Sequence, residues 1–91
     1  MKSINCKVEQ FKGTNGPVKN QFRLFVPGGV AFQSYSSVIA FRPWSGKIQL
    51  DREKWDYSKT TGKYRNIFLG ETKKETEAKI KSGEYLLTNL N

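Results

Sequence analysis

The amino-acid sequence predicts a single α+β domain spanning residues 1–91. The expected fold is a small antiparallel sheet of four or five strands with two short helices in the C-terminal half, in the order β-β-β-β-α-α-β. A chain of 91 residues has room for one hydrophobic core. Apolar and polar residues alternate through the first half, as they do in half-buried strands. The second half instead carries the start and stop signals of helices.

The first predicted strand is residues 3–11, SINCKVEQF, where apolar Ile4, Cys6 and Val8 alternate with polar residues. Cys6 is the single cysteine, so it cannot form an internal disulfide, and the chain suits a reducing compartment. The following residues 13–20, GTNGPVKN, contain an Asn-Gly-Pro run that predicts a turn.

The second predicted strand is residues 21–26, QFRLFV. Its alternating pattern places three apolar side chains on one face: Phe22, Leu24 and Val26. Arg23 and Phe25 then point away from that face. An exposed Phe25 could stack on a nucleic-acid base, or it could instead cover the second face of the sheet beneath a helix.

Residues 30–41, VAFQSYSSVIAF, are long for one strand, so we expect a bend or bulge between Ser34 and Ser37. Pro27-Gly28-Gly29 predicts a tight turn before this strand. The stretch Pro-Trp-Ser-Gly predicts another turn after it, and residues 47–51, KIQLD, return as a short strand.

Helix signals begin at Ser58, which is predicted to cap a helix through TTGKYRNIFL that stops at Gly70. An interior glycine at position 62 disfavours this helix by roughly 1 kcal/mol relative to alanine. The run Thr-Lys-Lys-Glu starting at Thr72 matches a capping box and opens a second helix that ends at Gly83. Residues 84–90, EYLLTNL, are predicted to form the last strand.

Composition argues against several classes of protein. The chain has no histidine, the commonest general base and metal ligand, and one cysteine cannot supply a zinc site. It has no glycine-rich phosphate-binding motif. Asp51 and Glu53 could bind a metal or act in acid–base chemistry, but solvated loop charges are the simpler interpretation. We therefore expect no enzyme, no cofactor and no metal.

The chain contains no apolar run of the length of a membrane helix and no signal peptide. The expected location is the cytoplasm, with no membrane partner. Sixteen Lys and Arg against eight Asp and Glu give a net charge of +8. A charge of this size says nothing about the fold, but it favours a polyanion as the binding partner. Alternatively, the charge only keeps the protein soluble.

The excess of positive charge is uneven. Residues 10–50 contain no Asp or Glu, whereas residues 51–91 hold nine basic and seven acidic residues. In the first window, basic residues are interleaved with aromatic ones, which is typical of small β domains that bind single-stranded nucleic acid. The candidate nucleic-acid or nucleotide contacts are Lys12, Lys19, Arg23, Phe25, Arg42, Trp44 and Lys47. Trp44 could equally be a lid on the core.

A second candidate site is WDYSKTTGKYRN, residues 55–66. If Ser58 caps a helix, the backbone N–H groups of Thr60 and Thr61 could form an anion site at the positive helix end. Three basic residues could add contacts to the same anion: Lys59, Lys63 and Arg65. The aromatic residues of this segment are expected mainly to pack.

The segments SYSSVIA, WDYSKTTGKYRN-x-FLGE and KIKSGEYLLTNLN resemble short proteins encoded by bacteriophages and other mobile elements of Gram-positive bacteria, classed as a domain of unknown function. The resemblance spans roughly residues 34–91 and implies no activity or site. It implies a bacterial host cytoplasm, where such proteins typically bind nucleic acid, inhibit a host factor or sequester a nucleotide signal. A nucleic acid, a nucleotide or a host protein is therefore the expected partner, and the sequence favours no oligomeric state.

Overall fold

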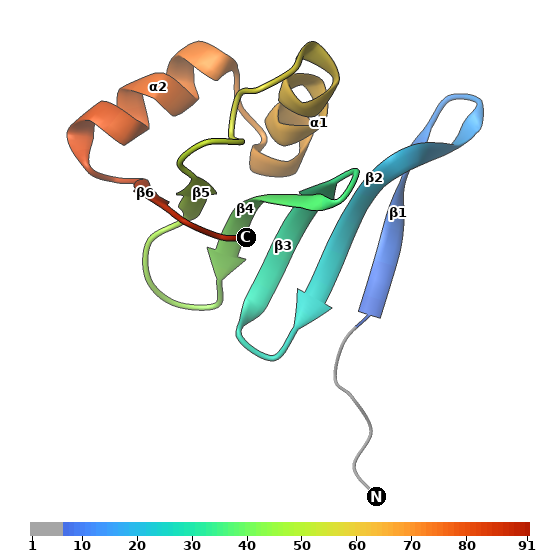
Figure 1. Ribbon diagram of the computed structural model, residues 1–91, viewed down its shortest axis with the longest axis horizontal. Helices are drawn as coiled ribbons and strands as arrows, with labels where there is room; N and C mark the ends of the chain where they lie inside the picture. The colour runs from blue at the N-terminus through green and yellow to red at the C-terminus, as the bar shows by residue number, and fades with distance from the viewer. Residues whose placement is uncertain (1–6) are drawn as a thin grey trace, which may run out of the picture.

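The computed structural model describes residues 7–91 and has the predicted α+β architecture, with both of its helices in the C-terminal half (Figure 1). Residues Ile4 and Cys6 of the first predicted strand lie outside the described residues. The elements in chain order are β1 (Lys7–Gly13), β2 (Gly16–Val26), β3 (Gly29–Ser34), β4 (Ser37–Pro43), β5 (Gln49–Asp51), α1 (Lys59–Leu69), α2 (Lys73–Ser82) and β6 (Leu86–Thr88).

The described residues form one sheet of six strands in the order β1-β2-β3-β4-β5-β6, so the prediction of four or five strands is wrong. The neighbours from β1 to β5 pair antiparallel, but β6 pairs parallel with β5, so the sheet is mixed. A parallel pairing needs a crossover, which α1 and α2 supply.

The extra strand comes from residues 30–41, which form the hairpin β3–β4 instead of one bent strand. The chain reverses at Tyr35, whose φ of 56° is in the left-handed region. Its backbone N–H donates a 2.7 Å hydrogen bond to the carbonyl oxygen of Asn20 on β2. The bend or bulge predicted between Ser34 and Ser37 is therefore at the correct position, but the chain makes a hairpin turn there.

The turn predicted over residues 13–20 is shorter in the structure. β1 and β2 pair up to Gly13 and Gly16, so the turn itself is short, and β2 begins five residues earlier than expected. Gly16 has a φ of 106°, which only glycine adopts readily. Pro17 and Val18 consequently belong to a strand.

The core lies on the face of the sheet that packs against α1. Phe32 on β3 is fully buried, with its ring edge-on to Phe11 at 5.5 Å and stacked on Phe68 of α1 at 5.7 Å. The buried hydrophobic cluster comprises Phe11, Val30, Phe32, Ile39, Ala40, Leu50, Phe68 and Tyr85.

The register decides which face of β2 is covered. Phe32 pairs with Arg23, and Val30 pairs with Phe25, so Arg23 and Phe25 share the covered face. Phe25 is half-buried and packs against the core, as in the second of the two predicted alternatives. Phe22, Leu24 and Val26 lie on the opposite face.

Both helices start and stop where the sequence signals predict. Ser58 Oγ accepts a hydrogen bond from the backbone N–H of Thr61, and Gly70 ends α1 with a φ of 71°. Thr72 and Glu75 form the complete capping box of α2, which ends at Gly83.

Candidate functional site

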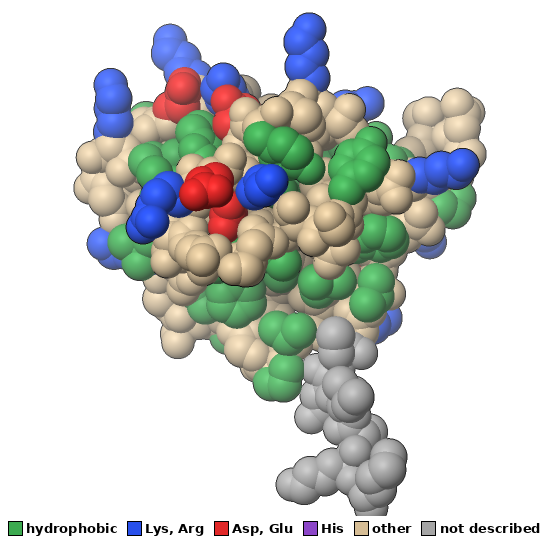
Figure 2. Space-filling model, viewed as in Figure 1, with side chains coloured by type: hydrophobic (Ala, Val, Ile, Leu, Met, Phe, Trp, Pro, Cys, Tyr) green, Lys and Arg blue, Asp and Glu red, His purple; other side chains and the backbone are tan. Residues whose placement is uncertain are grey.

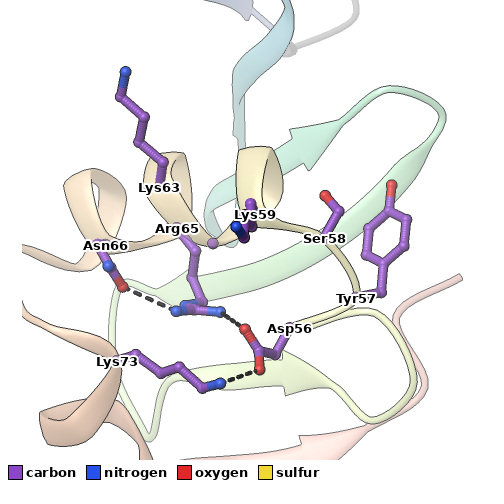
Figure 3. A pocket seen from close by; sticks show the side chains of 9 residues that line it. Asp56, Tyr57, Ser58, Lys59, Lys63, Arg65, Asn66 and Lys73 are labelled. Carbon is purple, nitrogen blue, oxygen red and sulfur yellow. Dashed lines mark hydrogen bonds and ion pairs between the residues drawn. The ribbon is translucent and has the colours of Figure 1, made fainter.

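The segment between β5 and the middle of α1 is organised by Arg65, whose side chain is 1% exposed. Its Nη1 donates to the carbonyl oxygen of Trp55 at 2.6 Å and to Asp56 Oδ1 at 3.1 Å. Its Nη2 donates to Asn66 Oδ1 at 3.0 Å. Asp56 in turn makes a 2.7 Å ion pair with Lys73, the first residue of α2 (Figure 3). Arg65 therefore ties the loop to both helices and is a structural residue.

Asp56 is held in its charged form by these partners. Desolvation pushes the pKa of its carboxyl up, but the hydrogen bonds and charges of Lys73 and Arg65 outweigh desolvation and hold the pKa below its usual value. The carboxylate therefore stays ionised and neutralises part of the local positive charge.

An open depression of about 430 Å³ lies beside this network. The residues that give it its chemistry are Tyr57, Lys59, Lys63, Arg65 and Lys73. Figure 3 shows Arg65 and Lys73 directed at Asp56, whereas Lys63 extends away from the network. Four cations against one carboxylate leave the depression positive.

A second depression of about 420 Å³ lies between the β1–β2 hairpin and α1. Lys12 on the hairpin and Lys63 on α1 both line it, so Lys63 borders both depressions. We call Lys12, Lys59, Lys63 and Lys73 the lysine band. It runs from the hairpin across α1 to the start of α2.

Aromatic side chains accompany the lysine band. Tyr57 is 44% exposed, and the Lys54 ammonium lies 5.1 Å from its ring centroid. Tyr64 lines the second depression, with Lys63 Nζ at 5.4 Å from its ring. Tyr57 can therefore offer a ring face to a ligand, while Tyr64 also packs against the core.

Two predicted contacts lie away from the lysine band. Trp44 and Lys47 are in the β4–β5 connection, on the opposite side of the molecule from the tip of the β1–β2 hairpin (Figure 1). Trp44 is 65% exposed, and its indole N–H donates to the carbonyl oxygen of Pro27 at 2.8 Å. Lys47 Nζ donates to the carbonyl oxygen of Gly83 at 2.8 Å.

The predicted arginine contacts take part in packing. The guanidinium of Arg23 lies 4.0 Å over the ring of Phe11 and 3.9 Å from Glu9 Oε1. Arg42 Nη2 donates to the carbonyl oxygen of Phe68 at 2.8 Å. Together with Phe25, these residues hold the covered face of the sheet. Lys19, in contrast, is exposed on β2.

The predicted anion site at the start of α1 is largely occupied by the chain itself. Thr61 is fully buried, and its hydroxyl lies 2.9 Å from that of Ser34 on β3. Its backbone N–H donates to Ser58 Oγ at 3.1 Å. Thr61 is therefore a packing residue, whereas Thr60 remains exposed.

Asp51, considered above as a possible acid–base residue, holds the residues that follow β6. Its Oδ1 accepts from the backbone N–H of Leu90 at 2.8 Å, and Oδ2 accepts from those of Lys54 and Glu53 at 3.0 and 3.2 Å. Burial raises the pKa of this carboxyl, but the hydrogen bonds from Leu90, Asn91 and the other two N–H groups have the larger effect. The pKa therefore lies below its usual value.

Two further properties concern residues 7–91 as a whole. No three His, Cys, Asp or Glu side chains in this part of the chain lie close enough together to hold a metal ion. None of its helices has the length and apolar character needed to cross a membrane.

Sequence patterns missed Lys73 and Tyr57 as members of the site. Lys73 is in the second helix, and nothing in its local sequence indicates that it reaches Asp56 on the preceding loop. The sequence predicts that Tyr57 packs, because aromatic residues next to a helix start usually do.

The model of a family described as "Family of unknown function (DUF8033)" matches residues 3–84. The expectation of a domain of unknown function is therefore confirmed, and the match includes the N-terminal third that the resemblance did not cover. No curated protein and no solved structure matches the chain.

Proposed function

We propose that this chain, which belongs to the family of unknown function DUF8033, is a non-enzymatic protein that binds nucleic acid through its lysine band. The supporting observation is that two open depressions, which share Lys63, are lined by lysines from three elements: Lys12, Lys59, Lys63 and Lys73. Lysines spaced along a groove follow a phosphate backbone, and an exposed ring such as that of Tyr57 stacks on a base.

The start of α1 adds to this positive potential. The N-terminal end of a helix carries a partial positive charge, and no residue of the first turn of α1 is acidic. The exposed hydroxyl of Thr60 adds a hydrogen-bond donor there. The binding surface that we propose therefore lies on the hairpin and α1, and it replaces the β surface expected from the sequence.

The proposed setting is the cytoplasm of a bacterium that carries a bacteriophage or another mobile element. This part of the proposal rests on the resemblance of DYSKTTGKYRN and its flanking segments to proteins of such elements. A non-enzymatic role is supported by the absence of histidine from the sequence and by the engagement of Asp51 with three backbone N–H groups.

A direct test is fluorescence anisotropy with a labelled, mixed-sequence single-stranded oligonucleotide at about 50 mM salt, where phosphate contacts are strongest. We expect binding that weakens as salt rises. In a variant carrying Lys59→Ala and Lys63→Ala, the slope of log affinity against log salt should become shallower by about 1.4, at about 0.7 per lost contact. The affinity should fall roughly tenfold or more.

The matched control carries Lys74→Ala and Lys81→Ala, which remove the same charge from the exposed surface of α2. It should bind almost as wild type does. Undetectable binding of wild type, or an equal loss in both variants, would contradict the proposal.

The second candidate is a counter-defence protein that sequesters a nucleotide signal or inhibits a host factor. The depression of about 430 Å³ favours nucleotide binding, because its volume falls in the range of small-molecule sites, and it combines cations with an aromatic ring. Adding mono- and cyclic dinucleotides to the same measurement separates the two candidates. Competition by short nucleotides as strong as that by the oligonucleotide would favour the second.

A further inference from the structure

The sheet face opposite α1 carries three rows of uncharged side chains. The register aligns one row across all six described strands: Val8, Leu24, Ala31, Phe41, Gln49 and Leu86. A second row contains Gln10, Phe22, Gln33 and Val38. A third row contains Val26 and Pro43 on either side of Gly29. We call these rows the open face.

The open face is apolar yet accessible. Val8 and Leu86, at its two edges, are 60% and 45% exposed, and the large side chains between them are half-buried. The contacts of α1 with the sheet lie on the other face, at Phe32, Ser34 and Arg42. Figure 2 shows hydrophobic side chains gathered over the strands in the lower half of the view, with Lys and Arg mostly around the margin.

The composition of the open face is unusual for a sheet face in contact with water. Antiparallel strands with one solvated face normally alternate apolar with polar or charged residues, whereas strands covered on both faces are apolar on both. Charged residues make up 26% of this chain, but the three rows contain none. The open face therefore has the character of a surface that is covered in the working molecule.

Two of the three glutamine side chains of the open face, those of Gln10 and Gln33, already have hydrogen-bond partners within the chain. Gln10 Nε2 donates to the carbonyl oxygen of Val18 at 2.8 Å, and Gln33 Nε2 donates to that of Tyr35 at 2.6 Å. Because these amides already have partners within the chain, covering them leaves fewer groups without a hydrogen bond.

We propose that the open face packs against the open face of a second copy of this chain, as the two sheets of a β-sandwich pack. The three rows span six, four and three strands, so with strands about 4.8 Å apart and rows about 6.6 Å apart they cover roughly 410 Å². The pair would bury on the order of 800 Å² as measured on flat faces, and more once the uneven side-chain surface is counted, which places it at the small end of specific interfaces, near their threshold of about 1,000 Å². Two identical apolar faces complement each other about a two-fold axis.

The lack of positive charge on the open face argues against nucleic acid as its binding partner. A polyanion needs cations opposite its phosphates, and the rows of the open face provide none. Lys59, Lys63 and Lys73 lie on the helices, which pack against the other face. A dimer would therefore keep both lysine bands outward, and one nucleic-acid strand could engage two of them.

Sedimentation equilibrium of the full chain at about 100 µM tests the proposal, because a dimer with a dissociation constant of about 1 µM holds roughly nine-tenths of the chains at that concentration. We expect twice the monomer mass of 10.4 kDa. Val8→Lys and Leu24→Lys should each weaken dimerisation at least tenfold. Val8 is already mostly exposed, so its variant should fold even if the Leu24 variant does not, and circular dichroism checks both.

The matched control is Ile67→Lys, which places the same charge on a side chain that is 50% exposed on α1. It should dimerise as wild type does. A monomeric wild type overturns the proposal, and so does a dimer that a folded Val8→Lys variant leaves unchanged. Neither outcome depends on nucleic-acid binding, so failure here and failure of the proposed function are separable.

Discussion

Gly62, in the interior of α1, is a position where one substitution should raise the stability of the protein. A Cβ at this position would lie 3.6 and 3.7 Å from the guanidinium nitrogens of Arg65 and 3.7 Å from Asp56 Oδ1, all ordinary contact distances. Alanine therefore fits, and its higher helix propensity should raise the free energy of unfolding by about 0.5–1 kcal/mol in Gly62→Ala. Urea denaturation measures this change as a higher midpoint with an unchanged slope.

Gly29→Ala is the contrasting control, since a Cβ at Gly29 would collide with the carbonyl oxygen of Arg42. That variant should lose stability. If Gly62→Ala were destabilised, the Arg65–Asp56 ion pair would require a residue without a side chain at position 62.

Single residues also show the limit of sequence-based prediction. Ser58, Thr72 and Glu75 were assigned correctly because their caps are local, with every partner within three residues. The burial of Thr61 could not be predicted, because its hydroxyl contacts Ser34, which is distant in the sequence. No local pattern reports such a contact.

At the scale of elements, the segment WDYSKTTGKYRN is a loop and the first part of a helix that are held together by one side chain. Arg65 joins its two ends through Trp55, Asp56 and Asn66. In Arg65→Met, these oxygens lose their donor while Asp56 retains Lys73. We therefore expect a loss of about 2–4 kcal/mol in the free energy of unfolding, measured by urea denaturation.

Lys63→Met is the control for this change. Lys63 is an exposed cation two residues earlier on the same helix, so its replacement should alter stability by less than about 0.5 kcal/mol while it weakens nucleic-acid binding. Equal stability of the two variants would show that Arg65 does not hold the segment together.

The strands were predicted less well than the helices, for a physical reason. Tyr35 lies in a run of strand-forming residues, and its left-handed turn depends on a hydrogen bond to Asn20. The covered face of β2 was equally undecided by its sequence, because QFRLFV carries apolar side chains on both faces. Only the pairing with β3, where Val30 and Phe32 face α1, settles it.

For the whole molecule, acid should be the destabilising condition. The pKa values of Asp51, Asp56 and Glu71 all lie below their ordinary values: burial raises each pKa, but hydrogen bonds lower each by more, and the charges of nearby cations add to this at Asp56 and Glu71. A depressed pKa adds stability above the unfolded-state value of about 4, and that stability disappears as the pH falls through the folded-state pKa.

We therefore expect urea denaturation to give similar free energies of unfolding at about pH 7 and pH 5, because the chain has no histidine to titrate between them, and a decrease below about pH 4. Asp51→Asn should be less stable at neutral pH and less sensitive to acid. A rise in stability on acidification would contradict this expectation.

The parallel pairing of β6 with β5 affects the order in which the strands join the sheet during folding. β1 to β4 are joined by short turns, so their pairings close small loops and can form as soon as each strand leaves the ribosome. The β5–β6 pairing closes a loop that contains both helices, and non-local contacts of this kind form slowly. We expect β6 to be the last strand added to the sheet.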